Sequence, residues 1–106
     1  MMSGSRIPFE THLEGLIEPA KAIMIDLRSF VKSLGSNVIE EVRPHRVAYA
    51  KTMNFRTFLD IAPAGDSLLL SIRYGKAAPP ATVTVRTAQE AENAKKQIAE
   101  AYQKIQ

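Results

Sequence analysis

Apolar residues recur along this chain with two different periods, and the change of period divides the chain into helices and strands. Between residues 19 and 34 the apolar positions are spaced three and four apart, which predicts an amphipathic helix. The apolar stripe of this helix consists of Ile23, Leu27, Phe30, Val31 and Leu34. Pro19 suits the first turn of the helix, and Gly35 is expected to end it in a left-handed conformation.

From residue 46 to residue 86, apolar and polar positions alternate instead, which is typical of strands that bury one face. Four strands are predicted, at about 46–51, 55–61, 67–74 and 82–86. Turn-forming residues separate them, at 52–54, 63–66 and 75–80. Residues 38–44 are rich in charge and are interpreted as a connection between the first helix and the sheet.

Helical segments are also predicted near both ends of the chain. Residues 8–15 contain Phe9, His12 and Leu13 and predict a short helical turn that packs onto the body. Thr87 and Glu90 have the spacing of a capping box, which marks the start of a closing helix. The apolar stripe of that helix consists of Ala91, Ala94, Ile98, Ala101, Tyr102 and Ile105.

The order helix, four strands, helix predicts an α+β fold (α-β-β-β-β-α). We expect a single antiparallel sheet of about four strands with the N- and C-terminal helices packed on one face. At 106 residues the chain fits one domain, with residues 1–8 as a disordered or loosely packed leader and 9–106 as the domain. No apolar stretch approaches the roughly 20 residues of a membrane span, and the absence of cysteine suits a reducing compartment, so we expect a cytoplasmic protein.

The alternation also predicts which side chains lie on the sheet face opposite the helices. They are Arg46, Ala48, Ala50, Arg56, Phe58, Asp60, Leu69, Ser71, Arg73, Thr82, Thr84 and Arg86. This face mixes arginines with apolar groups and leaves two hypotheses open, beside that of a solvated face. The first is a homodimer or protein-partner surface with Phe58 and Leu69 at its centre and arginines at its rim.

The second hypothesis is an anion or nucleic-acid surface, which the net charge of +3 permits. In it, arginine side chains contact phosphates and Phe58 stacks on a base. The arginines concerned are Arg46, Arg56, Arg73 and Arg86. The densest basic stretch, residues 43–56, could hold a phosphate or carboxylate through its arginines and His45, or could be a charged strand edge that discourages pairing.

A weaker pocket is predicted from His45, Tyr49, Lys51 and Tyr74. An acid/base role for the first three requires that they converge in one cleft, whereas tyrosines in the core with hydroxyls at its rim explain the tyrosines equally well. Glu40 and Glu41 are adjacent and point to opposite sides of any strand, so they form no converging pair.

No spacing in the sequence points to a cofactor or a metal. His12 and His45 are the only histidines, and neither has a partner at ligand spacing. The sequence contains no glycine-rich phosphate loop and no glycine-framed serine nucleophile. The residues therefore favour a binding domain without catalytic activity, cofactor or metal.

Four short segments resemble a small bacterial and archaeal domain of unknown function. They are FETHLEG at 9–15, FVKSLG at 30–35, HRVAYAK at 45–51 with Asn54 and Phe55 after it, and the pair Ala101 and Tyr102. That domain occurs alone and at the C-terminus of larger proteins described as predicted transport or restriction-associated proteins. The resemblance spans nearly the whole chain and implies the fold, but it implies no functional residue. Relatives carry a longer segment, often with a histidine and an aromatic residue, where this chain has residues 75–81.

Overall fold

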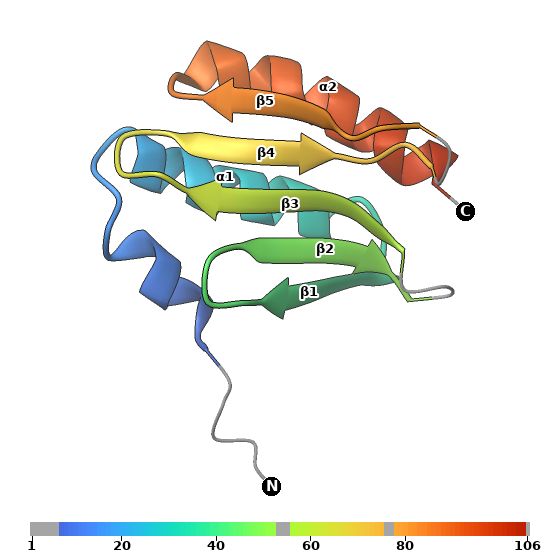
Figure 1. Cartoon of the computed structure of the whole chain (residues 1–106), viewed down its shortest axis with the longest axis horizontal. Coiled ribbons are helices and arrows are strands. Elements are labelled where there is room, and N and C mark those ends of the chain that lie inside the picture. Colours follow the sequence, from blue (N-terminus) through green and yellow to red (C-terminus); the bar gives the residue numbers. More distant parts are fainter. Residues whose placement is uncertain (1–6, 53–55, 76–77, 106) are drawn as a thin grey trace, which may run out of the picture.

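The computed structural model describes residues 7–52, 56–75 and 78–105. The elements in chain order are the 3-10 helix η1 (Phe9–Leu13), α1 (Ala20–Lys32), β1 (Val38–Val42), β2 (Val47–Lys51), β3 (Thr57–Pro63), β4 (Leu68–Ile72), β5 (Ala81–Val85) and α2 (Ala88–Lys104). The five strands of the described residues form one antiparallel sheet in the order β1-β2-β3-β4-β5. Both long helices lie on the same face of this sheet (Figure 1). The predicted α+β class, single sheet and helix placement are confirmed, with five strands in place of four.

The four predicted strands agree with β2 to β5 within two residues at each end. The turn predicted at 52–54 and the strand position of Phe55 fall partly or wholly outside the described residues, as do residues 1–6 and 76–77. Within the described ranges, no helix combines the length and the apolar character that crossing a bilayer requires.

The connection predicted at residues 38–44 is wrong, because most of it is the edge strand β1. This strand pairs with β2 along its whole length, from Val38 opposite Lys51 to Val42 opposite Val47. Val38 and Val42 pack against the core from the helix side. Glu40 occupies the inward position between them, and this acid in the middle of the apolar positions is what hides the strand alternation in the sequence.

The core lies between the sheet and the two helices. The residues of α1 and α2 that are buried there are Ala20, Ile23, Met24, Leu27, Val31, Ala91, Ala94, Ile98 and Ala101. Burying a large apolar side chain stabilises the fold by about 1.5–3 kcal/mol. The short helical turn predicted at residues 8–15 adds to this core, since Phe9 and His12 of η1 are buried and His12 Nε2 donates a hydrogen bond of 2.7 Å to the carbonyl of Arg43.

The helix boundaries follow local signals. The capping box predicted for α2 is present, with the Thr87 hydroxyl accepting from the Glu90 amide at 3.1 Å and the Glu90 carboxylate accepting from the Thr87 amide at 3.2 Å. Helix α1 begins directly after Pro19, as predicted. The left-handed end predicted at Gly35 is wrong, because among the described glycines only Gly65, in the predicted turn at 63–66, has a positive φ (75°).

Gly35 serves a different purpose, which is to leave room for Tyr102. A Cβ atom at this position would clash with the Tyr102 hydroxyl and with the side-chain oxygen of Asn37. These two groups are hydrogen-bonded to each other, with the hydroxyl donating. The glycine therefore allows α2 to be tied to the segment that joins α1 to β1.

A β-bulge in β3 changes the face on which Phe58 lies. Tyr49 of β2 is opposite Leu59, but the next residue, Ala50, is opposite Thr57, so Phe58 is an extra residue in β3. An inserted residue breaks the two-residue alternation of side chains. Phe58 and Leu59 are both fully buried, and the Phe58 ring meets the ring of Tyr102 edge-on at 5.4 Å between centroids. The prediction that Phe58 lies on the open face is therefore wrong.

The placement of Phe58 can be tested by stability. We expect Phe58→Ala to lower the free energy of unfolding by about 3–5 kcal/mol, because it removes a buried aromatic ring and leaves a cavity. The control is Leu69→Ala on the open face, where the residue is 42% exposed and the loss should stay below about 1 kcal/mol. Urea unfolding followed by circular dichroism measures both. A Phe58→Ala variant as mild as the control would contradict the buried placement.

Candidate functional site

The open face of the sheet is hollowed beside Asp60 of β3, and the hollow extends to Ile105, the residue that follows α2. The hollow has a volume of about 700 Å³. Its charged lining consists of Arg43, Arg46, Arg56, Asp60 and Arg73, and small or apolar residues complete it. Four guanidinium groups and one carboxylate therefore give this part of the surface a net positive charge.

The strand register brings these residues together from separate parts of the chain. Asp60 in the middle of β3 is opposite Ala48 on one side and Ser71 on the other. Arg46 is two residues before Ala48, and Arg73 is two residues after Ser71. Because residues two apart in a strand share a face, Arg46 and Arg73 lie on the same face as Asp60 and approach it from neighbouring strands.

Asp60 is the counter-ion of this arrangement. Its Oδ1 lies 3.7 Å from Nε of Arg46, and its Oδ2 lies 3.8 Å from Nε of Arg73. Both distances exceed that of a hydrogen bond. The Asp60 side chain is only 12% exposed, whereas those of Arg46 and Arg73 are 52% and 46% exposed. The two guanidinium groups are thus loosely oriented by a recessed carboxylate and keep donors that face solvent.

The structure brings together Arg46, Arg56 and Arg73 of the predicted surface residues. Arg86 follows β5 and does not line the hollow, and its backbone amide donates to the Glu90 carboxylate at 2.7 Å. Leu69 is exposed on the open face but also lies outside the hollow. With Phe58 in the core, the apolar centre predicted for this face is reduced to Leu69 among the described residues.

The basic stretch at 43–56 is divided between different environments. Arg43 joins the hollow, and its guanidinium donates to Glu41 at 2.7 Å. His45 is exposed between β1 and β2 and does not line the hollow. Lys51 points elsewhere, since its Nζ donates to the carbonyl of Ile105 at 3.1 Å and lies 4.4 Å from the centre of the Tyr102 ring. The stretch therefore does not act as one site.

The predicted acid/base cluster of His45, Tyr49 and Lys51 does not converge either. The Tyr49 hydroxyl donates to Glu40 at 2.8 Å on the helix side of the sheet. Burial, together with this hydrogen bond, raises the pKa of Tyr49 far above its ordinary value, so the hydroxyl stays protonated. Tyr74 is partly buried against the core, and burial raises its pKa as well. The two tyrosines therefore contribute to the packing of the fold and do not form a pocket with His45 and Lys51.

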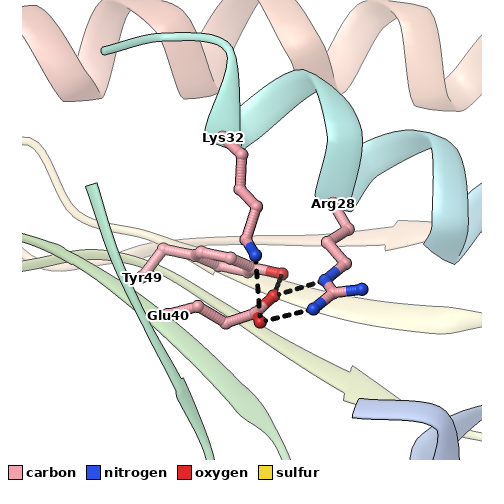
Figure 2. A network of polar contacts seen from close by, with 4 residues as sticks. All are labelled: Arg28, Lys32, Glu40 and Tyr49. Carbon is pink, nitrogen blue, oxygen red and sulfur yellow. Dashed lines mark hydrogen bonds and ion pairs between the residues drawn. The ribbon is translucent and has the colours of Figure 1, made fainter. Parts of the chain in front are cut away.

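Sequence reasoning missed Glu40, which organises a polar cluster between α1 and the sheet (Figure 2). Its carboxylate accepts hydrogen bonds from Arg28 at 2.8 and 2.9 Å and from the Tyr49 hydroxyl at 2.8 Å, and Lys32 Nζ lies 3.5 Å away. The Arg28 guanidinium also lies 4.1 Å from the centre of the Phe9 ring. The signal in the sequence was the pair Arg28 and Lys32, which are one helical turn apart and face the same acid.

The charge state of Glu40 follows from two opposing effects. Burial alone would raise the pKa of this carboxyl, but the hydrogen bonds from Arg28 and Tyr49 outweigh it and lower the pKa below its ordinary value of 4.5. The same hydrogen bond raises the pKa of Arg28. Because the carboxylate is ionised and well supplied with donors, the cluster is a structural tie and not a proton-transfer centre.

Comparisons with known proteins do not identify a relative. No protein-family model, no curated protein and no solved structure matches this chain. The resemblance to the small domain of unknown function therefore stays a prediction. Within the residues that the structure describes, no group of three or more histidine, aspartate or glutamate side chains could hold a metal ion. Among the described residues, the arginine-lined hollow is thus the main candidate for a binding site.

Replacing Glu40 by glutamine should destabilise the protein and flatten the dependence of its stability on pH. A carboxyl whose folded-state pKa is lowered stabilises the fold above its ordinary pKa, and this contribution is lost as the pH falls below 4.5. At neutral pH we expect a loss of about 1.5–3 kcal/mol, the range for hydrogen bonds to charged groups. Urea unfolding of both proteins at neutral pH and in acid measures the difference.

The control is Glu41→Gln, which removes the neighbouring acid on the exposed face. The Glu41 side chain is 63% exposed and pairs with Arg43, so its loss should cost less than about 1 kcal/mol. Equal losses for the two variants at neutral pH, or a Glu40→Gln difference that persists undiminished in acid, would contradict the assigned role of Glu40.

Proposed function

We propose that this protein is a non-enzymatic binding domain whose open sheet face takes up a ligand with several negative charges. The observation that carries the proposal is the gathering of Arg43, Arg46, Arg56 and Arg73 around one hollow of about 700 Å³. Both long helices lie on the other face of the sheet and leave its open face uncovered (Figure 1). The cysteine-free composition suits a reducing compartment, so we also propose a cytoplasmic location.

The chemistry of the lining supports an anionic ligand. The guanidinium group presents planar pairs of donors that match phosphate and carboxylate oxygens. In the described part of the lining, four such groups face a single recessed carboxylate, and Glu41 outside the hollow pairs with Arg43, so positive charge remains in excess. A concave surface of one charge concentrates the field and attracts ligands of the opposite charge.

The energetics of the fold point the same way. Like charges that lie close together repel each other and destabilise a folded protein. The core does not depend on Arg46 and Arg73, because these two side chains lie beside Asp60 on the face away from α1 and α2. An anion in the hollow would relieve the repulsion, and the protein would therefore become more stable when such a ligand binds.

The alternative, a homodimer or protein-partner surface, has less support. Interface cores are depleted of charged residues and centre on buried aromatic or aliphatic anchors. Phe58, which was expected to provide the anchor, is buried under α2. Leu69 is the one large, exposed apolar side chain on this face in the part of the chain that the structure describes. A protein that docked on the hollow would have to be acidic.

The proposal predicts a salt-dependent affinity for polyanions that depends on the hollow. Binding of a labelled single-stranded oligonucleotide is followed by fluorescence anisotropy at increasing NaCl concentrations. The double variant Arg56→Gln/Arg73→Gln should bind more weakly, and its slope of log affinity against log salt should be smaller by about 2, since each lost phosphate contact releases one counterion fewer.

The matched control is the double variant Arg86→Gln/Lys96→Gln, which removes the same charge outside the hollow. Arg86 does not line the hollow, and Lys96 is exposed on α2. This control should keep a slope close to that of the original protein. Equal slopes for the two double variants would overturn the assignment to the hollow. Absence of binding to DNA, RNA, polyphosphate and heparin, with a stable dimer by light scattering, would favour the protein-interaction alternative.

A further inference from the structure

The floor of the hollow holds a carboxylate with unused acceptor capacity. Asp60 is the only acidic side chain among the described residues that line the hollow. Among the described residues, the cationic atoms paired with it are the Nε atoms of Arg46 and Arg73, which are 3.7 and 3.8 Å away and thus beyond hydrogen-bond distance. A carboxylate can accept about four hydrogen bonds. A ligand donor that enters the hollow can therefore bind to Asp60 without displacing a protein partner.

Asp60 is nearly buried, but a small part of its side chain remains accessible to such a donor. Its neighbours across the sheet, Ala48 and Ser71, have small side chains. The Asp60 side chain keeps 12% of its surface exposed, and this residue lines the hollow. The arginines around it are about half exposed, so a ligand meets their guanidinium groups first and the carboxylate deeper in the hollow.

This arrangement of arginines around a carboxylate favours some classes of ligand over others. A compact anion on the floor of the hollow would be repelled by Asp60, and a ligand with an ammonium group would be repelled by the four arginines. The ligand that fits both has its negative charges outside, at the arginines, and a neutral N–H donor directed inward. A nucleotide has this composition, and a single strand presents phosphates in series with base edges that are not paired.

The arginines can also supply the base contact for which the sequence suggested Phe58. Bases of single strands stack on arginine guanidinium planes as well as on aromatic rings. Arg46 and Arg73 are each loosely held through Nε on either side of Asp60 and are half exposed. A base that lies against one of these planes directs its edge toward the carboxylate between them.

We infer that the hollow binds single-stranded nucleic acid, with the arginines on phosphates and bases and with Asp60 accepting a hydrogen bond from a base amino group. This inference rests on the proposed function and names its ligand class. A carboxylate accepts readily from the amino group of cytosine. Uracil has no exocyclic amino group, and its one ring N–H lies between two carbonyl oxygens that would face the carboxylate. Asp60 should therefore favour cytosine over uracil.

The test compares labelled oligo(dC) with labelled oligo(dU) of equal length by fluorescence anisotropy at low salt. The original protein should bind oligo(dC) at least about fivefold more tightly, the lower limit for a specific base contact. Asp60→Asn should bring this ratio close to one, because the neutral amide also donates to uracil carbonyls. The affinity for polyphosphate, measured by competition, should stay equal or rise in Asp60→Asn, since a negative charge is removed from the hollow.

The matched control is Asp66→Asn, which removes one acid from the exposed turn between β3 and β4 and should keep the preference for oligo(dC). Thermal melts establish that each variant is folded. If Asp60→Asn does not fold, Asp60→Glu replaces it, because this variant keeps the charge but moves the acceptor. It should also bring the ratio of the affinities for oligo(dC) and oligo(dU) closer to one, without weakening polyphosphate binding.

The outcomes separate this inference from the proposed function. If neither the oligonucleotides nor polyphosphate bind, the proposed function itself is wrong. If polyphosphate, poly-glutamate or duplex DNA bind as well as single strands, or if oligo(dC) and oligo(dU) bind equally to the original protein, anion binding stands and the single-strand inference is overturned. A preference for oligo(dC) that survives in folded Asp60→Asn overturns the role of Asp60.

Discussion

The extra residue in β3 decides what each face of the sheet contributes. Because Phe58 is inserted between the pairs Tyr49–Leu59 and Ala50–Thr57, its ring lies in the core against Tyr102. Uninterrupted alternation would have placed an aromatic ring on the open face, where Thr57 and Asp60 now line the hollow. The bulge therefore enlarges the apolar core under α2 and leaves the opposite face to charged side chains.

The two faces use the same kinds of residue in different ways. On the helix side, Glu40 receives short hydrogen bonds of 2.8 to 2.9 Å from Arg28 and Tyr49, and the cluster ties α1 to the sheet. On the open side, Asp60 has two arginines at 3.7 and 3.8 Å, beyond hydrogen-bond distance. Distance and exposure thus separate a carboxylate that stabilises the fold from one that is available to a ligand.

Periodicity predicted the two long helices, the capping box and four strands, because the apolar positions in those segments are uninterrupted. It missed β1, where Glu40 occupies an inward position that only the cations of α1 make tolerable. It misplaced Phe58, because a bulge depends on the pairing of two strands and not on local sequence. Arg46 and Arg73 were predictable, since alternation holds on β2 and β4. The distances between Asp60 and these arginines depend on three strands and could not be read from one segment.

The most direct test of this account is an NMR titration of the ¹⁵N-labelled protein, including the Nε–Hε signals of arginine, with a short single-stranded oligonucleotide. The account predicts that the largest shift changes occur at Arg46, Arg56 and Arg73 and at the amides of Thr57 and Asp60, while the amides of α1 and α2 change little. Changes centred on the helices, or on Leu69 and Arg86 without the hollow, would contradict the claim that the bulge leaves the binding surface to the arginine-lined hollow.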